Sequence, residues 1–213
     1  MVMTGICEAT TRPKNAAATR EAILAAARAR FLEESYDNVG LRDIAGDAGV
    51  DVALVSRYFG GKEKLFAEVL KKPDEHWLPD GISGDELPAL LTTLFMNHNE
   101  DEHRQHAEHL LIMLRSASSP NASPIVREAL RSEVMEPLAA CLKGPNAEAR
   151  ASLAIAVWMG ATMLRAVMPV EPMCDNKCEF LEAKLILSYE AALSEIDLGS
   201  VPACGSGPVT EAA

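Results

Sequence analysis

Aromatic residues and long apolar runs are scarce in this sequence. Only 5% of its 213 residues are Phe, Trp or Tyr, and no stretch approaches the roughly 20 consecutive apolar residues that span a bilayer. The first 20 residues, MVMTGICEATTRPKNAAATR, also lack the apolar segment of a signal peptide. A cytoplasmic protein without a membrane partner is therefore expected.

Cysteine and catalytic motifs are equally sparse. The five cysteines are odd in number and irregularly spaced, which favours free thiols in a reducing compartment over a disulfide framework. The run Gly60-Gly61-Lys62 lacks the spacing of a phosphate-binding P-loop, and no G-x-S-x-G motif occurs. These absences argue against an enzyme, and the sequence indicates no cofactor.

The residues that are abundant favour packed helices. Alanine and leucine are frequent, and no strand pattern is evident. Charge is unevenly distributed: residues 1–72 carry 11 Lys and Arg against 10 Asp and Glu, whereas residues 73–213 carry 9 against 21. A near-neutral first third joined to an acidic remainder permits a local basic surface and suggests two domains.

Glycine and proline divide the chain into about nine expected helices. Their approximate ranges are 17–34, 41–48, 52–58, 62–72, 83–97, 101–117, 124–142, 147–168 and 176–196, with a bend at Pro137. The sequence thus predicts an all-α fold. We expect a disordered arm at 1–16, a first domain at 17–72, a second helical domain at 73–197 and a flexible tail at 198–213.

The segment Leu41–Gly60 fits a helix-turn-helix motif. Ala45 is small where the two helices would cross, Gly49 falls in the turn, and Asp51 is a good N-cap for the second helix. The positions that would hold the helices at an angle are Ile44, Ala48, Val50, Val55 and Tyr58. With these turned inward, the expected outward surface, suited to a DNA major groove, consists of Val52, Ala53, Ser56 and Arg57.

The segment IAGDAGVDVALVSRYFGGKEKLF, preceded by TREAILAAARARFLEESYDNVGLRD, resembles the DNA-binding domain of the TetR/AcrR transcriptional regulators over about residues 19–70. The resemblance implies a recognition helix from Val52 to Phe59 and a homodimer on a pseudo-palindromic double-stranded DNA operator. It also implies that the helices after Pro73 form a ligand-binding and dimerisation domain. The resemblance implies, as the commoner outcome, that a small-molecule effector releases repression.

The resemblance also assigns roles to single residues. Tyr58 and Lys62 match positions that grip phosphates, Arg42 lies at the start of the first motif helix, and the groove-facing positions are Val52, Ala53, Ser56 and Arg57. Three positions depart from the usual pattern: Gly40 replaces a Thr or Ser cap, Ser35 replaces a helix-ending glycine, and Ser56 replaces a common tyrosine. The departures leave the fold prediction intact and bear only on the set of DNA contacts.

Segments of the second domain resemble the C-terminal domain of one subgroup of the family: LLIMLRSASSP, EVMEPLAACLKGPNAEAR and VWMGATMLRAVMPVEP. This implies that the last two long helices pack against those of a second subunit as a four-helix bundle. Independently, an apolar stripe with Gly160 beside it consists of Ala154, Val157, Ala161 and Leu164. The stripe suits either a dimer interface or the core of one subunit, and we expect the interface.

Methionine and aromatic residues of the second domain are candidates for a pocket that takes an apolar or amphipathic ligand. The candidate residues are Phe95, Met96, His106, Met113, Trp158, Met159, Met163 and Arg165. Arg165 would orient an anionic ligand or pair with an acidic helix, and the apolar candidates would serve equally well as core. Trp77, close to the domain junction, is expected to report a hinge motion.

A metal- or thiol-responsive regulator is the alternative hypothesis. In the run NHNEDEHRQHAEHL, residues His98, Glu102 and His106 are four apart, while His103 and His109 each lie three residues from His106. Cys174 and Cys178 are also four apart and would bind a metal or sense oxidants. A solvated helix face and incidental free thiols account for the same residues, so no metal is expected.

Overall fold

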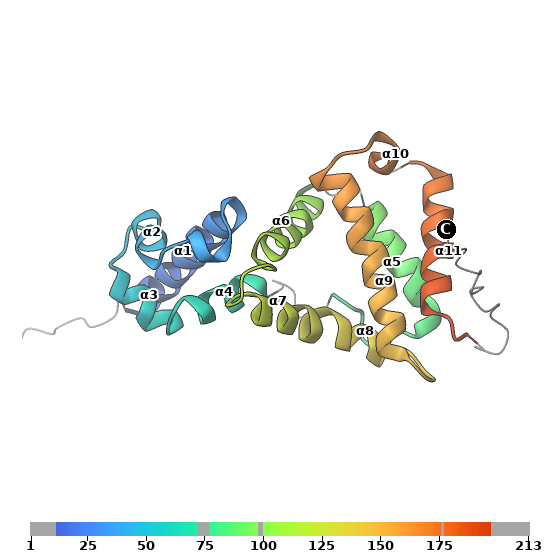
Figure 1. Cartoon of the computed structure of the whole chain (residues 1–213), viewed down its shortest axis with the longest axis horizontal. Coiled ribbons are helices and arrows are strands. Elements are labelled where there is room, and N and C mark those ends of the chain that lie inside the picture. Colours follow the sequence, from blue (N-terminus) through green and yellow to red (C-terminus); the bar gives the residue numbers. More distant parts are fainter. Residues whose placement is uncertain (1–11, 72–76, 98–99, 176, 197–213) are drawn as a thin grey trace, which may run out of the picture.

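The computed structural model describes residues 12–71, 77–97, 100–175 and 177–196, which form helices and no strand. The all-α prediction is confirmed. The helices are α1 (Arg12–Glu33), α2 (Leu41–Asp47), α3 (Val52–Phe59), α4 (Lys62–Leu70), α5 (Leu87–Met96), α6 (Glu100–Ser116), α7 (Ser123–Leu130), α8 (Glu136–Ala140), α9 (Ala147–Thr162), α10 (Glu171–Cys174) and α11 (Glu179–Leu193). Figure 1 shows α2 and α3 near one end of the molecule, and α5, α9 and α11 at the other.

Several boundaries differ from the predicted ones. Helix α1 begins at Arg12, inside the segment 1–16 that was expected to be an arm. Helix α4 ends at Leu70 rather than at residue 72. The last helix begins at Glu179 rather than at residue 176, and the short α10 is the one helix among the described residues from Met168 to Cys178. The expectations for residues 1–11 and for the tail at 198–213 lie outside the described residues.

Local signals place the helix-turn-helix motif as the sequence predicts. The Asp51 carboxylate accepts a hydrogen bond from the Ala53 amide at 2.7 Å and so caps α3. Gly49, in the turn between α2 and α3, has φ 66°, and Gly60, directly after α3, has φ 77°. Both values lie in the left-handed region that glycine adopts without steric cost. The turn therefore requires glycine at Gly49, and α3 ends where Gly60 reverses the chain.

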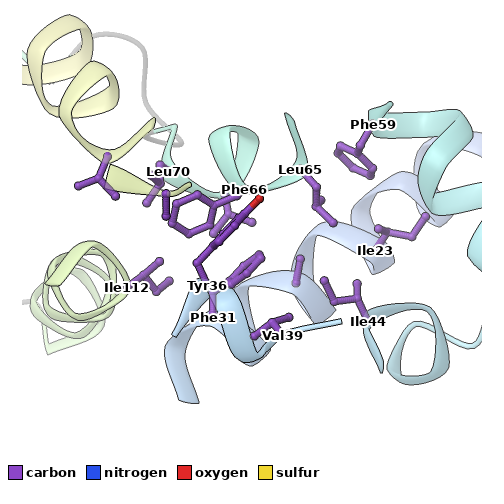
Figure 2. Packing of buried hydrophobic residues seen from close by; sticks show 14 of the residues in the cluster. Ile23, Phe31, Tyr36, Val39, Ile44, Phe59, Leu65, Phe66, Leu70 and Ile112 are labelled. Atoms are coloured by element: carbon purple, nitrogen blue, oxygen red, sulfur yellow. The ribbon is translucent and has the colours of Figure 1, made fainter. Parts of the chain in front are cut away.

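Buried residues around α1 to α4 form what we call the first core. Phe31, Tyr36 and Phe66 meet at its centre, with ring centroids 4.8 to 6.0 Å apart. Ile112 of α6 packs against the same cluster in Figure 2. The remaining members of the first core are Ile23, Ala27, Val39, Ile44, Ala45, Val55, Phe59, Leu65, Val69, Leu70, Leu110, Met113, Ala122 and Val126. The first core thus extends past residue 72 into α6 and α7.

The second core joins α5, α8, α9 and α11. Its largest fully buried side chain is that of Tyr189. The other members are Leu87, Leu91, Phe95, Met96, Leu138, Ala151, Ala154, Ile155, Ala161, Leu185 and Leu193. Half-buried Met159 packs against both cores, so α9 carries the boundary between them.

Two helical regions of the second domain contain π-helical turns, at Arg131–Met135 and at Met163–Val167. The first replaces the predicted bend at Pro137 within a single long helix. Because Pro137 has no N–H to donate, the Glu133 carbonyl cannot receive the usual bond from the residue four positions later. The indole N–H of Trp77 donates to that carbonyl at 3.1 Å instead. The irregular turn therefore anchors Trp77.

The apolar stripe expected at a dimer interface points elsewhere. Ala154 and Ala161 are buried in the second core of the same chain, and Val157 packs against it. The exposed side of α9 instead carries Leu153, Ala156 and Gly160, and Leu164 in the following π-helical turn is exposed as well. Helix α9 is apolar on both sides, so helical spacing alone selected the wrong one. Of the predicted stripe, only Leu164 faces outward.

Candidate functional site

The exposed face of α3 is built from residues at helical spacing. Ala53, Ser56 and Arg57 are all exposed, and we call them the recognition face. Because they lie three and four positions apart, they share one side of the helix. Val55 and Phe59 occupy the opposite side and are buried in the first core. Burial of that side fixes the rotation of α3 and presents the recognition face to solvent.

Two residues expected on the DNA-contacting surface are only half-exposed. Val52 and Tyr58 both pack against the first core. Val52 precedes Val55 by three positions and Phe59 by seven, so it falls on the inward side of the helix. Most of the Val52 side chain is therefore turned inward, contrary to the predicted outward orientation. Tyr58 also supports the core, as the motif analysis expected.

The two basic residues at the edges of the motif differ in environment. Arg42, in the first turn of α2, is exposed. Lys62 begins α4, and its ammonium nitrogen lies 4.3 Å from the centroid of the Tyr36 ring. Burial lowers the pKa of Lys62 from its ordinary value, while the nearby carboxylates of Asp37 and Glu63 oppose that shift. Lys62 is thus held against the protein rather than extended into solvent.

The acidic residues of α2 and its flanks are engaged in structural roles. Arg30 of α1 makes a two-point contact with Asp47, from Nε to Oδ2 at 2.5 Å and from Nη2 to Oδ1 at 2.8 Å. Asp43 accepts a hydrogen bond from the Gly40 amide at 3.2 Å, and so caps α2 where a Ser or Thr is absent. Among the described residues, no ion pair involves Arg42 or Arg57. Both guanidinium groups are available to a phosphate or a base.

A cavity of about 280 Å³ lies where the two cores meet. Met113 of the first core and Met159, which touches both cores, line it. Helix α1 contributes Arg28, and the segment before α5 contributes Trp77. The other lining residues are Leu91, Leu94, Gln105, His106, His109, Leu110, Leu130, Val134, Ile155 and Trp158. The lining is mainly apolar with a few polar groups, which is typical of a small-molecule site.

The structure brings some of the predicted pocket residues together. His106, Met113, Trp158 and Met159 line the cavity, and the rings of His106 and Trp158 meet edge to face at 5.3 Å. The guanidinium of Arg165 instead stacks 3.7 Å from the centroid of the Phe95 ring, and its Nε donates to the Met173 carbonyl at 2.7 Å. Arg165 and Phe95 border an adjoining hollow of about 10 Å³, which shares His106 and Trp158 with the cavity.

The other two predicted pocket residues lie away from the cavity. Met96 is buried in the second core, with its sulfur 3.9 Å from Nη2 of Arg165. Met163 begins the second π-helical turn, where α9 ends. Neither residue is among the described residues that line the cavity. The prediction grouped Met96 and Met163 with Trp158 by residue type, which does not tell which side of a helix faces the cavity.

Sequence reasoning missed the contributions of Arg28 and Trp77 to the cavity. Nothing in α1 itself marks Arg28, because its role depends on α1 lying beside a domain that begins 45 residues or more later. Trp77 was expected to report a hinge, but it lines the cavity together with Trp158. The signal for Trp77 was Pro137, which frees the carbonyl that the indole binds.

The described residues contain no group of three or more His, Cys, Asp and Glu residues that could hold a metal ion. His98 lies outside the described part of the chain, as do the side chains of Glu102 and His103. His106 and His109 face the cavity instead. Cys174 is exposed and Cys178 half-buried, and both are free thiols. The family matches given next, and not this absence, disfavour the metal- or thiol-responsive alternative.

Comparison with protein families agrees with this arrangement. Residues 23–69 match the family model described as bacterial regulatory proteins, tetR family. Residues 85–186 match the model described as tetracyclin repressor-like, C-terminal domain. The chain belongs to the TetR family. It is therefore a DNA-binding transcriptional regulator with a ligand-binding C-terminal domain, and not an enzyme.

Solved structures of TetR-type regulators share the fold. Salmonella enterica GusR aligns with a TM-score of 0.64 at 15% identity, covering 86% of this chain and 98% of GusR. NalD, the secondary repressor of the MexAB-OprM multidrug efflux pump in Pseudomonas aeruginosa, gives 0.61 at 22%, covering 82% and 97%. SmeT, in its complex with triclosan, gives 0.58 at 24%, covering 91% and 100%. These likenesses concern the fold.

A search among curated proteins gives no significant match. Within the described part of this TetR-family regulator, no helix has both the length and the apolar character needed to cross a membrane.

Proposed function

We propose that this regulator is a homodimeric repressor that a small apolar or amphipathic ligand releases from a pseudo-palindromic operator. The observation that carries the proposal is the cavity between the two cores, because its lining includes Arg28 of α1 and Met113 of the first core. A ligand there touches the helices that support the recognition face. Such a ligand can change DNA affinity only if it prefers one arrangement of those helices over another.

DNA recognition would rest on Arg57, Ser56 and Ala53 in the major groove. Arg57 suits a guanine, whose two acceptor atoms match the guanidinium, while exposed Arg42 suits a phosphate. Lys62 and Tyr58 would pack against the helix-turn-helix motif and contact phosphates of the DNA backbone at the edge of the groove. Two recognition helices about 34–36 Å apart would reach successive major grooves on one side of the duplex.

Dimerisation would use an apolar surface on α9 and α11, which we call the outer face. It combines Leu153, Ala156 and Gly160 of α9 and Leu164 of the π-helical turn that follows with Phe180 and Leu187 of α11. Phe180 is 71% exposed, Leu153 58% and Leu187 54%. Large apolar side chains gathered at this exposure are typical of a surface that a partner covers. Two copies of the outer face would form a bundle of four helices.

Two structural relatives motivate the choice of repression over activation and the choice of a small-molecule ligand. NalD is a repressor, and SmeT has been captured with triclosan. We extend to this chain the same combination of repression and binding of a small molecule. The mainly apolar lining of its cavity supports that extension.

The proposed contacts can be tested on a duplex selected from a random pool by the purified protein. Arg57→Ala should weaken binding to that duplex by about 1–3 kcal/mol and relax base preference at one position of each half-site. Arg42→Ala should weaken all duplexes alike and reduce the slope of affinity against salt by about one unit. Lys62→Ala should also reduce the slope, but by less, because its ammonium rests on Tyr36.

Repression needs a readout in cells. A reporter gene placed behind the selected duplex should be silent in cells that carry the regulator and active in cells that lack it. Failure of the purified protein to bind any duplex in a salt-sensitive manner would reject the DNA-binding role. A reporter that is more active when the regulator is present would reject repression while leaving DNA binding intact.

A further inference from the structure

We infer that the regulator responds to an aromatic anion, such as an aryl carboxylate, whose charge Arg28 receives. This inference rests on the proposed function and specifies the ligand class of the same cavity. Among the described residues that line the cavity, Arg28 carries a fixed positive charge and none is Asp or Glu. The whole chain has a formal net charge of −11. That net charge opposes anions over most of the molecule, so the preference for an anion rests on the lining itself, which offers the Arg28 guanidinium to an anion and no carboxylate to a cation.

Arg28 is positioned to pair with such an anion. It is half-buried in α1, and its Nη2 donates to the Val69 carbonyl at 3.3 Å. Among the described residues no ion pair joins Arg28 to an acidic side chain. A guanidinium has five N–H donors in a planar fork that matches a carboxylate. One long bond to a carbonyl leaves much of that capacity for a ligand.

The rest of the lining suits a flat ring. Trp77 and Trp158 come from separate segments, and Met113 and Met159 add flexible thioethers to the same lining. Aromatic rings pack well against indoles and against methionine sulfur. His106, which meets Trp158 edge to face, adds a polar group that can orient a second substituent. A ligand that uses both the guanidinium and the indoles is therefore aromatic at one end and negatively charged at the other.

The same contact connects the ligand to DNA binding. Val69 lies in the last turn of α4, where carbonyl groups have no partner within the helix. A carboxylate is a stronger acceptor for a guanidinium than a carbonyl is. A bound anion would therefore draw the Arg28 guanidinium from the Val69 carbonyl and remove one of the contacts between α1 and the end of α4, while the first core stays packed. Because α4 follows α3 directly through Gly60 and Gly61, this change would alter how the recognition face is held.

The test compares two probes that differ in charge, 2-naphthoate and its neutral isostere 2-naphthamide. Titration calorimetry on the full chain without DNA gives their affinities for the parent, for Arg28→Met and for the matched control Arg115→Met. Arg115 also bridges helices, since its Nη1 donates to the Glu33 carbonyl of α1 at 2.7 Å, but it does not line the cavity. Methionine keeps the apolar stem in each variant and removes the charge.

The parent and Arg115→Met should bind 2-naphthoate at least about tenfold more tightly than 2-naphthamide. In Arg28→Met the two affinities should become equal, with the affinity for 2-naphthamide unchanged, which also shows that the variant is folded. Equal affinities in the parent, a preference that survives in Arg28→Met, or no binding of 2-naphthoate would each overturn the inference. Since no DNA is present, these outcomes are separate from failure of the DNA-binding and repression tests.

Discussion

The two cores of the molecule are built differently. The first core is filled by three rings in mutual contact and closes tightly around α1 to α4. The second domain holds two π-helical turns, a cavity of about 280 Å³ at its border with the first core, and an exposed apolar outer face. Figure 1 places the motif helices and the α9–α11 pair at opposite ends of the molecule.

This difference separates a rigid part from an adjustable one. A close-packed aromatic core fixes the rotation of α3, and so the direction of Arg57. Irregular helix turns and unfilled volume instead offer alternative packings of similar free energy. Val134 belongs to the first π-helical turn and also lines the cavity, so that irregularity meets the ligand site directly. Helices α6 and α7 complete the first core and would carry a change in the adjustable part to the rigid one.

The largest expected effect concerns the outer face of the adjustable part. Gly160→Leu should abolish the dimer and weaken duplex binding by about 10²–10⁴-fold, because two half-sites would no longer be bound as one. A Cβ at Gly160 meets no atom within 4 Å, so each subunit should fold normally. Sedimentation measures the mass, and circular dichroism checks the fold. Phe180→Ser, at a side chain that is 71% exposed, should have the same effect.

If both variants remain dimeric with parental duplex affinity, the interface lies on other helices.

The next effect tests whether α6 belongs to the rigid part. Ile112 is fully buried in the first core. Ile112→Ala should therefore lower the free energy of unfolding by about 2–5 kcal/mol, and it should reduce hydrogen-exchange protection in α1 and α4. Leu114→Ala is the matched control, because Leu114 is on the same helix and 41% exposed. Protection that falls in α9 and α11 but stays unchanged in α1 would assign α6 to the second core alone.

A smaller effect is expected at Trp158. Its ring lines the cavity, so Trp158→Phe should weaken binding of an aromatic ligand by about 0.5–1.5 kcal/mol and leave duplex affinity unchanged. Calorimetry with 2-naphthoate gives the first quantity and fluorescence anisotropy of a labelled duplex the second. Trp77 also lines the cavity, so indole emission alone does not separate the two sites. A lower melting temperature with parental ligand affinity would make Trp158 a core residue only.

The smallest effect concerns an ion pair within the rigid part. Hydrogen bonding to Lys71 and to Arg20 lowers the pKa of Glu68, and the Arg20–Glu68 contact, 2.6 Å long, ties α1 to α4. Because the folded-state pKa is the lower one, this stabilisation is present above the unfolded-state pKa and is lost as pH falls through the folded-state value.

Glu68→Gln should therefore destabilise the protein by less than about 1 kcal/mol at pH 7 and not at all well below pH 4. Denaturant unfolding of both proteins at the two pH values measures the difference. If the variant and the parent differ in free energy of unfolding by the same amount at both pH values, the effect comes from packing of the glutamine and not from the ion pair.

Local signals made the motif predictable from sequence. The turn at Gly49 and the cap at Asp51 depend on neighbouring residues only, and both are observed. Side-chain orientation was predictable where polar and apolar faces differ, as for Arg57 and Val55. The prediction of orientation failed for Val52, an apolar residue at the margin of the buried side of α3.

The cavity depends on contacts between distant segments, and sequence patterns say little about those. Met113, Met159 and Trp158 were suggested by residue type, but the same criterion also selected Met96 and Met163, which lie elsewhere. Arg28 lies in the first helix and its partner Val69 in the fourth, and no spacing rule joins either to α9. On α9, apolar residues on both sides made the buried and exposed stripes indistinguishable until packing separated Ala154 from Leu153.

In this regulator, cavity occupancy and DNA binding should oppose each other, and the effect of bound DNA on ligand affinity decides whether they do. The affinity of whichever naphthalene probe binds the free protein more tightly should be measured again with the protein saturated by its selected duplex. Because coupling is reciprocal, a ligand that releases DNA must bind the DNA-bound protein more weakly, by about 5–150-fold. We expect the probe to lose affinity by a factor within that range when DNA is bound. Equal affinities for the free and the DNA-bound protein would show that the cavity and the recognition face are not coupled.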